Sequence, residues 1–270
     1  MHGPLRSRSA TSKHAGPPRI LLLIIGLTSI GPLALNILMP AVPVMGRTFS
    51  ADAGTVQLTL SLFLLGLAVS QLAHGPLSDR FGRRPVMIAG LLLTIAASLA
   101  AVAAASISWL IVARTIQALG ASAGLVLGRA IIRDLYERDE AASMIGWATM
   151  AMVVVPMVAP SIGGALDTAF GWRSIFLFIG LFTAILLIWV MAALPETRAI
   201  AAGGSGAARF VEETRALVRD RRFIGYALAS GFGSAIFFAF LGGAPHVVIT
   251  MMGRSSAEYG LWFATGALGY

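Results

Sequence analysis

The stretch GPLSDRFGRRP, residues 75–85, decides the fold, because it places four charges between two long apolar runs. Only 12% of the 270 residues are charged, whereas 57% are hydrophobic. A soluble domain has about 25% charged residues. The flanking runs, at about residues 55–74 and 86–106, are each long enough to cross a bilayer as a helix. The pattern therefore predicts a charged turn between two membrane-spanning helices.

Similar apolar runs recur along the chain, and each approaches the twenty residues that a spanning helix needs. Seven complete runs are predicted, at about residues 20–45, 55–74, 86–106, 109–131, 141–166, 174–194 and 223–248. The first is too long for the core of a signal peptide, so we expect an uncleaved span. An eighth run begins near Ala257 and stops at Tyr270, so we expect a chain truncated within its eighth helix.

The positive charges predict the orientation of these spans. Most of the 20 Lys and Arg residues fall in the first nineteen residues and in alternate connections between the apolar runs. The opposite connections hold only Arg47, Arg173 and Arg254. Short cytoplasmic loops are enriched in Lys and Arg, so we expect the N-terminus in the cytoplasm of a cell with a bacterial-type inner membrane. This placement explains the net charge of +8 without a nucleic-acid partner.

The composition of the connections divides the chain. We expect a cytoplasmic tail (1–19), a six-helix transmembrane bundle (20–194), a cytoplasmic linker (195–222) and the start of a second bundle (223–270). The linker contains the flexible segment AAGGSGAA. Its second half has apolar residues at helical spacing, which fits either an amphipathic helix on the inner membrane surface or a solvated linker.

The residues of the charged stretch predict a tight cytoplasmic hairpin. Gly75 and Gly82 permit turns, and Pro76 and Pro85 bracket the interruption. Asp79 is expected to accept backbone N–H bonds at the start of the following helix.

This stretch resembles the loop signature of the major facilitator superfamily, in which a Gly-x-x-x-Asp-Arg-x-Gly-Arg-Arg pattern joins the second and third helices. The matching residues are Gly75, Asp79, Arg80, Gly82, Arg83 and Arg84. The resemblance implies a charge relay between two bundles, with Asp79 and Arg83 as its main members and Asp134 as a candidate partner. Taken singly, Arg80 and Arg84 are better explained as residues that fix membrane topology.

The fourth run carries a charge within the membrane. Arg114 either snorkels to the outer surface or faces an aqueous cavity as a functional residue. Gln117 lies on the same helical stripe. Three glycines at four-residue spacing predict close helix packing on a neighbouring stripe: Gly120, Gly124 and Gly128. The Arg-x-x-Gln-Ala-x-Gly string resembles the Bcr/CflA branch of drug-resistance antiporters, and this resemblance implies a role of Arg114 in proton transfer.

The fifth run combines prolines and glycines. Pro156 and Pro160 predict a kink, and Gly163 with Gly164 predicts close approach to a neighbouring helix. The run resembles the antiporter signature of the fifth helix in this superfamily. The alternative is a bent helix without a role in coupling. The LPETR segment, residues 194–198, also resembles the family's sixth-helix ending.

The first run predicts a polar point inside the membrane, because Pro40 leaves the carbonyl of Asn36 without a helical donor. In the family that the chain resembles, many members carry an Asp at this position as a candidate proton carrier, whereas Asn36 cannot take up a proton. Histidine is the side-chain type able to titrate near neutral pH, but His74 and His246 each lie near the end of an apolar run and are interpreted as interfacial residues.

These features predict an all-α transporter of the major facilitator fold, with a substrate site near the membrane midplane and alternating access from the two sides. The expected substrate and proton pathway consists of Asn36, Gln57, Arg114 and Gln117. We expect export of small amphipathic molecules in exchange for protons by a monomer in the lipid bilayer. The alternatives are a proton-independent facilitator or exchanger, and a truncated protein that does not transport.

The sequence offers no basis for an enzyme. It contains no Cys, which excludes disulfides and thiolate metal sites. It shows no Ser/His/Asp set, metal-ligand cluster or phosphate loop, so no cofactor or metal is expected.

Overall fold

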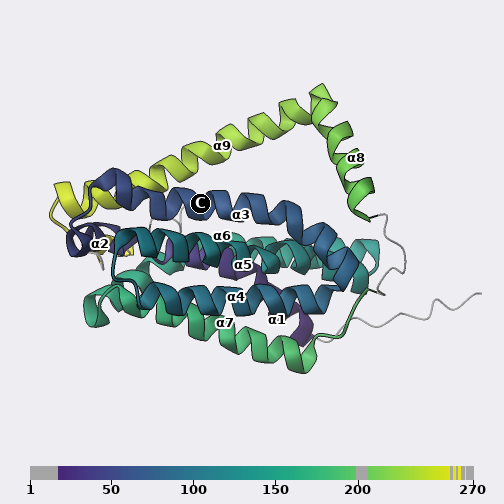
Figure 1. Cartoon of the computed structure of the whole chain (residues 1–270), viewed down its shortest axis with the longest axis horizontal. Coiled ribbons are helices and arrows are strands. Elements are labelled where there is room, and N and C mark those ends of the chain that lie inside the picture. The colour runs from purple at the N-terminus through teal and green to yellow at the C-terminus, as the bar shows by residue number, and fades with distance from the viewer. Residues whose placement is uncertain (1–17, 199–205, 256–257, 260, 263–264, 266–270) are drawn as a thin grey trace, which may run out of the picture.

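The computed structural model describes residues 18–198, 206–255, 258–259, 261–262 and 265, and these residues are almost entirely helical (Figure 1). The elements are α1 (Pro18–Asn36), η1 (Met39–Ala41), α2 (Val42–Phe49), α3 (Ala53–Phe81), α4 (Arg83–Val102), α5 (Ile107–Leu135), α6 (Arg138–Phe170), α7 (Arg173–Ala193), α8 (Gly206–Arg219), α9 (Arg221–Pro245) and η2 (His246–Met251). Most of the predicted tail, much of the AAGGSGAA segment and most of the eighth apolar run lie outside the described residues.

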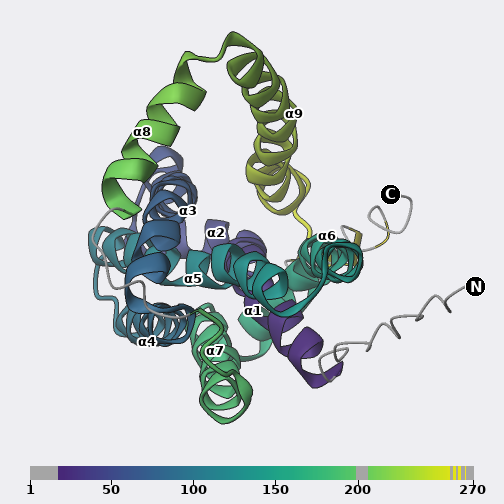
Figure 2. The same cartoon turned by 90° about the vertical axis from the view of Figure 1, so that its right-hand side faces the viewer.

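Six stretches of the described chain are long and apolar enough to cross a membrane. They are Arg19–Phe49, Ala53–Phe81, Arg83–Val102, Ile107–Leu135, Arg138–Phe170 and Arg173–Ala193. They match the first six predicted runs and pack side by side as one bundle (Figures 1 and 2). The seventh predicted run corresponds to α9 and η2. These two elements are not among the six stretches that are long and apolar enough to cross a membrane. Together with α8, α9 forms an arm that lies apart from the bundle over most of its length (Figure 2).

The first span is broken, whereas the sequence predicted one continuous run. α1 ends at Asn36, and the chain continues through the short 3-10 turn η1 into α2. Pro40 lies in the first turn of η1, where its missing N–H is not needed. The N–H of Ala41 donates to the carbonyl of Leu38 at 3.0 Å, which tightens the chain at this point.

The hairpin between the second and third spans is shorter than predicted. Gly75 and Pro76 do not form a turn, because α3 continues through both residues to Phe81. Gly82 alone separates α3 from α4, and its φ of 94° belongs to a region that favours glycine. A proline is tolerated inside a membrane helix because neighbouring groups satisfy the freed carbonyl. The expected turn at Gly75 was therefore wrong, and the one at Gly82 is confirmed.

Glycines of α5 allow this helix to pack tightly against its neighbours, as the four-residue spacing predicted. A Cβ atom on Gly124 would overlap the backbone carbonyl of Leu27 in α1. A Cβ atom on Gly120 would overlap the carbonyl of Gly90 in α4. α5 therefore lies against α1 on one side and α4 on another, at the close range that small residues permit.

We predict that Gly124→Ala destabilises the folded protein by about 1–3 kcal/mol, because the added methyl group forces α1 and α5 apart. The matched control is Gly225→Ala in α9, where a Cβ atom meets nothing within 4 Å. This control should be neutral or slightly stabilising, because alanine favours helix more than glycine. Thermal unfolding in detergent measures both variants, and equal midpoints would contradict the close packing of α5.

Candidate functional site

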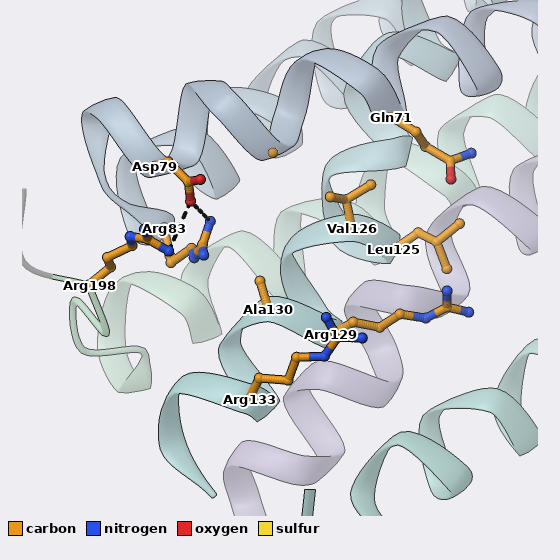
Figure 3. Close-up of a pocket in the computed structure, with 10 residues that line it drawn as sticks. Gln71, Asp79, Arg83, Leu125, Val126, Arg129, Ala130, Arg133 and Arg198 are labelled. Atoms are coloured by element: carbon orange, nitrogen blue, oxygen red, sulfur yellow. Dashed lines mark hydrogen bonds and ion pairs between the residues drawn. The ribbon is translucent and has the colours of Figure 1, made fainter. Parts of the chain in front are cut away.

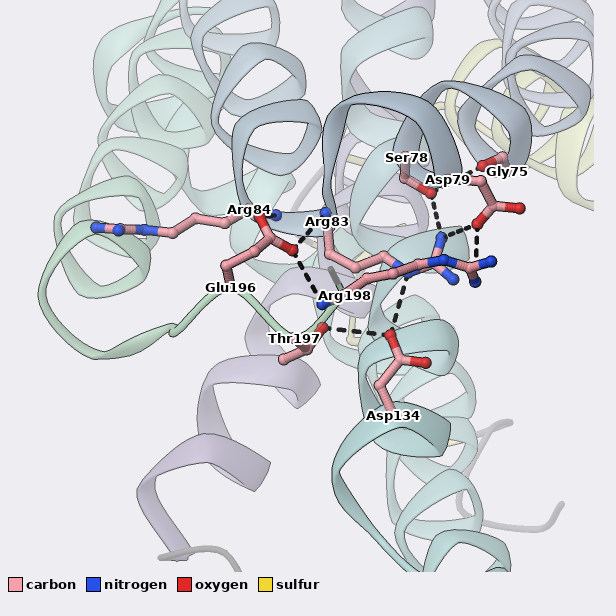
Figure 4. A network of polar contacts seen from close by, with 9 residues as sticks. All are labelled: Gly75, Ser78, Asp79, Arg83, Arg84, Asp134, Glu196, Thr197 and Arg198. Atoms are coloured by element: carbon pink, nitrogen blue, oxygen red, sulfur yellow. Dashed lines mark hydrogen bonds and ion pairs between the residues drawn. The ribbon is translucent and has the colours of Figure 1, made fainter. Parts of the chain in front are cut away.

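A buried guanidinium organises the charges at the end of the bundle where α3 turns into α4 (Figure 4). The Arg83 residue is only 6% exposed. Its Nη1 donates to Asp79 Oδ1 at 2.8 Å and also to Ser78 Oγ. Its Nε donates to Asp134 Oδ2 at 3.2 Å. Arg83 therefore ties the start of α4 to the ends of α3 and α5, and it brings together the three residues that the resemblance assigned to a relay.

Glu196 caps the first turn of α4 from the segment that follows α7. Its Oε1 accepts the backbone N–H of Arg83 at 2.8 Å, and its Oε2 accepts that of Arg84 at 3.2 Å. Oε1 also accepts the N–H of Arg198 at 3.2 Å. The first N–H groups of a helix have no partner within the helix, and a carboxylate there is stabilised by the helix dipole.

The capping role was predicted for Asp79, and this assignment was wrong. Asp79 instead accepts the guanidinium groups of Arg83 and, at 3.1 Å, of Arg198. The sequence did point to residues 194–198 as a family-like segment, but it gave no partner for Glu196. The only sequence signal was a carboxylate directly after the last span of the bundle.

Two further contacts close this network around the hairpin. The Thr197 hydroxyl donates to Asp134 Oδ2 at 3.2 Å. Arg84 Nη2 donates to the carbonyl of Met191 near the end of α7, at 2.8 Å. Arg80 is exposed and lies over the ring of Phe81, with 5.1 Å from its Cζ to the ring centroid. The structure thus places Arg84 in the network and Arg80 outside it.

A pocket of about 330 Å³ lies beside this network, between α3 and α5 (Figure 3). Its lining residues are Gln71, Gly75, Asp79, Arg83, Leu125, Val126, Arg129, Ala130, Arg133 and Arg198. Four of them are arginines and one is an aspartate, so the pocket is positively charged and suited to anionic or electron-rich groups. Arg129 and Arg133 are exposed.

Arg114 lies inside the bundle and is 0% exposed, so in this conformation it neither snorkels to a surface nor lines an open cavity. Its Nη1 donates to the carbonyl of Ala34 at 3.0 Å and to Gln117 Oε1 at 2.6 Å. Its Cζ lies 3.9 Å from the centroid of the Phe63 ring, which fits a cation–π contact. In the described part of the structure its Nε and Nη2 have no hydrogen-bond partner.

The other predicted pathway residues are only partly gathered around Arg114. Gln117 turns toward α4, where its Nε2 donates to Ser98 Oγ at 2.7 Å. Asn36 Nδ2 donates to the carbonyl of Pro32 at 2.7 Å, and Asn36 Oδ1 is buried without a partner among the described residues. Asn36 follows the Arg114-bound Ala34 by two residues. Gln57 is half-buried near the start of α3, and no described hydrogen bond links it to the other three.

The prolines and glycines of the fifth run lie in α6, which continues without interruption from Arg138 to Phe170. A Cβ atom on Gly163 would overlap the backbone carbonyl of Ile37, directly after the end of α1. Gly164 and Pro160 are buried, and Pro156 is half-buried. The glycine face of α6 therefore packs against the break in the first span. This agrees with the close approach that the sequence predicted at Gly163 and Gly164.

Metal-binding chemistry has no support in the described residues, which contain no group of three or more His, Cys, Asp or Glu side chains that could hold a metal ion.

Comparison with known proteins gives consistent matches along most of the chain. Residues 20–270 match the family model described as Major Facilitator Superfamily. The chain is 34% identical over 258 residues to Multidrug resistance protein D of Escherichia coli (strain K12), which covers 91% of this chain and 65% of the relative. It is 34% identical over 249 residues to a Chloramphenicol resistance protein of Pseudomonas aeruginosa, covering 92% of this chain and 58% of the relative. The chain therefore spans less than two thirds of the length of these relatives.

Solved structures show the same fold at lower sequence identity. A bacterial homolog of the human lysosomal transporter Spinster, in an inward-facing and unoccupied conformation, matches with a TM-score of 0.77 and 19% identity, over 95% of this chain and 62% of the other. A D-xylose-proton symporter matches with a TM-score of 0.69 and 15% identity, over 93% and 65% of the two chains.

We predict that Glu196→Ala lowers the free energy of unfolding by about 1–2 kcal/mol, because the first N–H groups of α4 lose their acceptor. Glu196→Gln keeps one acceptor oxygen and should lose less. The control is Glu212→Ala on the exposed side of α8, which should leave stability unchanged. Unfolding in detergent compares the three variants. If Glu196→Ala and Glu212→Ala unfold alike, Glu196 does not stabilise the hairpin.

Proposed function

The chain belongs to the major facilitator superfamily, and on this premise we propose that it exports small amphipathic molecules across the bacterial cytoplasmic membrane in exchange for protons. The observation that carries the proposal is the similarity of nearly the whole chain to proteins named for drug resistance. This similarity agrees with the Bcr/CflA-like motifs. The known relatives and structural neighbours are transporters, so an enzymatic activity has no support.

The transport pathway is proposed to centre on Arg114, with Asn36, Gln117 and Gln57 as further members. Arg114 and Asn36 each keep a buried polar atom without a partner among the described residues. A buried polar group that lacks a hydrogen bond costs about 1–3 kcal/mol, so these groups gain free energy when a substrate or water reaches them. The rings of Phe63 and Phe176 beside the guanidinium offer an apolar surface to the same substrate. Such a site suits a molecule with both polar and aromatic parts.

We propose that alternating access depends on the contacts of Arg83 with Asp79 and Asp134 and of Arg198 with Asp79, called here the hairpin latch. These contacts would hold one conformation closed and would break in the other. Arg83 holds the ends of α3, α4 and α5 together through Asp79 and Asp134, and Gly82 supplies the only break between α3 and α4. Arg198 adds the segment after α7 to the same carboxylate. A rearrangement of these few contacts would change how this end of the six-helix bundle packs against the second bundle of the transporter. We infer that the buried face of α6, with Gly163 against α1, transmits the same change to the substrate site.

Orientation and assembly are part of the same proposal. We infer that the end carrying the hairpin network faces the cytoplasm, because its arginines follow the positive-inside rule. The protein is proposed to act as a monomer in the lipid bilayer.

A proton-independent facilitator or exchanger is the second candidate, favoured by Asn36. In the six described spans the acidic residues lie near the helix ends, and Asn36 itself cannot carry a proton. Asn36→Asp separates the two candidates, because it should create pH dependence in a facilitator. The third candidate, a protein that does not transport, predicts no substrate movement under any gradient.

We predict that the purified full-length protein, reconstituted into liposomes, moves radiolabelled chloramphenicol against its concentration gradient when a pH gradient is imposed. Collapse of the pH gradient with nigericin should reduce this accumulation by about tenfold or more, because proton flow supplies the driving force. Liposomes without protein provide the background. Chloramphenicol movement that is unaffected by nigericin would contradict proton coupling and support the facilitator.

A further inference from the structure

A buried polar stripe runs along α3 toward the hairpin network. Ser70, His74 and Ser78 follow one another at four-residue spacing, so they lie on one helical face. They are 6%, 8% and 0% exposed. The stripe faces α5, because Ser70 Oγ lies 2.6 Å from Ser122 Oγ. None of the roles assigned so far uses this stripe apart from Ser78, which accepts a bond from Arg83.

The sequence placed His74 near a helix end, whereas in the structure it is buried and lies within α3. α3 continues for seven residues beyond it, which corresponds to about 10 Å of helix. The side chain is enclosed between α3 and α5, where its Nδ1 lies 3.3 Å from Ser122 Oγ. The sequence placed His74 near a helix end because the predicted turn began at Gly75.

The hydrogen bonds of His74 identify the nitrogen that can take up a proton. Its Nδ1 lies 2.7 Å from the carbonyl oxygen of Ser70. A carbonyl oxygen only accepts, so Nδ1 carries the hydrogen of the neutral ring and Nε2 is the free basic nitrogen.

No other side chain inside the six described spans changes its charge near neutral pH away from a helix end. The acidic residues of these spans are Asp79, Asp134, Asp139, Glu140 and Asp167, and all lie within the first or last few residues of their helices. Arg114 stays charged, because a guanidinium is not deprotonated in proteins. Histidine is the side chain that titrates between about pH 5 and 8.

We propose that His74 is the proton-binding site of this protein and that its Nε2 carries the exchanged proton. The proposal rests on the proposed antiport and supplies the titratable group that Asn36 cannot provide. In the binding step Nε2 accepts one proton and the ring becomes an imidazolium. In the release step the same N–H bond breaks and the proton returns to water, so no other bond changes.

The position of His74 connects its charge to the hairpin latch. His74 and Ser78 are one helical turn apart, about 5–6 Å between their Cβ atoms, and Ser78 binds the guanidinium of Arg83. The charged groups near this end of the stripe are Asp79 on α3, Arg83 on α4, Arg129, Arg133 and Asp134 on α5, and Arg198 after α7. Within the described residues none of them forms an ion pair with His74. We infer that a positive charge on His74, one helical turn from the Ser78 hydroxyl that binds Arg83, competes with Arg83 for Asp79 and Asp134 and so weakens their contacts.

Nuclear magnetic resonance of the full-length protein with isotope-labelled histidine tests proton binding directly. The chain has 4 His residues, so His74→Asn identifies the signal by its loss. Asparagine also keeps an N–H that can reach the Ser70 carbonyl, which limits structural damage. We expect the neutral ring to carry its hydrogen on Nδ1 and to take up a proton on Nε2 as the pH is lowered to 5. A ring that stays neutral at pH 5, or that carries its hydrogen on Nε2, would overturn the proposal.

Transport in liposomes separates this proposal from the proposed antiport. His74→Asn should lose pH-driven accumulation of chloramphenicol by about tenfold or more while it retains chloramphenicol exchange without a pH gradient. His246→Asn, at an exposed position in η2, should behave like the parent. If the parent is driven by the pH gradient and His74→Asn is driven equally, the role of His74 is refuted and the antiport stands. If the pH gradient does not drive chloramphenicol transport by the parent protein, the proposed antiport is refuted. The transport role of His74 is then refuted as well, even if its ring takes up a proton.

Discussion

The hydrocarbon core of a membrane cannot solvate a charge or an unpaired backbone group, and this constraint organises the described structure. Apart from Arg114, the charged residues of the described spans lie toward the span ends, where Arg83, Glu196 and their partners form a dense network. The one arginine enclosed within the bundle, Arg114, is held by a backbone carbonyl, a glutamine and an aromatic ring. The same constraint makes each remaining unpaired polar atom a place where a ligand gains binding energy.

Close packing of small residues brings these polar groups within reach of one another. Arg114 on α5 bonds to the carbonyl of Ala34 on α1, and Gly124 allows those two helices to approach without a side chain between them. Gly163 brings α6 onto the break that follows Asn36. The proposed substrate site, the broken first span and the glycine faces therefore lie next to one another. His74 and Ser78 form a second line of polar side chains in the last third of α3, and Ser78 at its end binds Arg83.

The sequence predicted what depends on local composition and missed what depends on distant contacts. Apolar runs placed six spans, because burial in lipid requires about twenty apolar residues. The glycine spacing of α5 predicted its tight packing, because only small residues allow backbones to meet. The turn at Gly75 was wrong, since proline does not end a membrane helix when its neighbours satisfy the backbone. The Glu196 cap and the burial of His74 could not be predicted, because each depends on which elements meet in space; Glu196 lies 113 residues from Arg83.

The central claim is that these helices cross the bilayer with their arginine-rich ends toward the cytoplasm, and cysteine labelling of intact cells tests it most directly. The sequence has no Cys, so single introduced thiols report alone. Glu137→Cys lies at an exposed position between α5 and α6, and Ala105→Cys lies at an exposed position between α4 and α5. With a maleimide that cannot cross membranes, we predict labelling of Ala105→Cys and none of Glu137→Cys until the cells are opened. Labelling of Glu137→Cys in intact cells, with Ala105→Cys protected, would contradict the account.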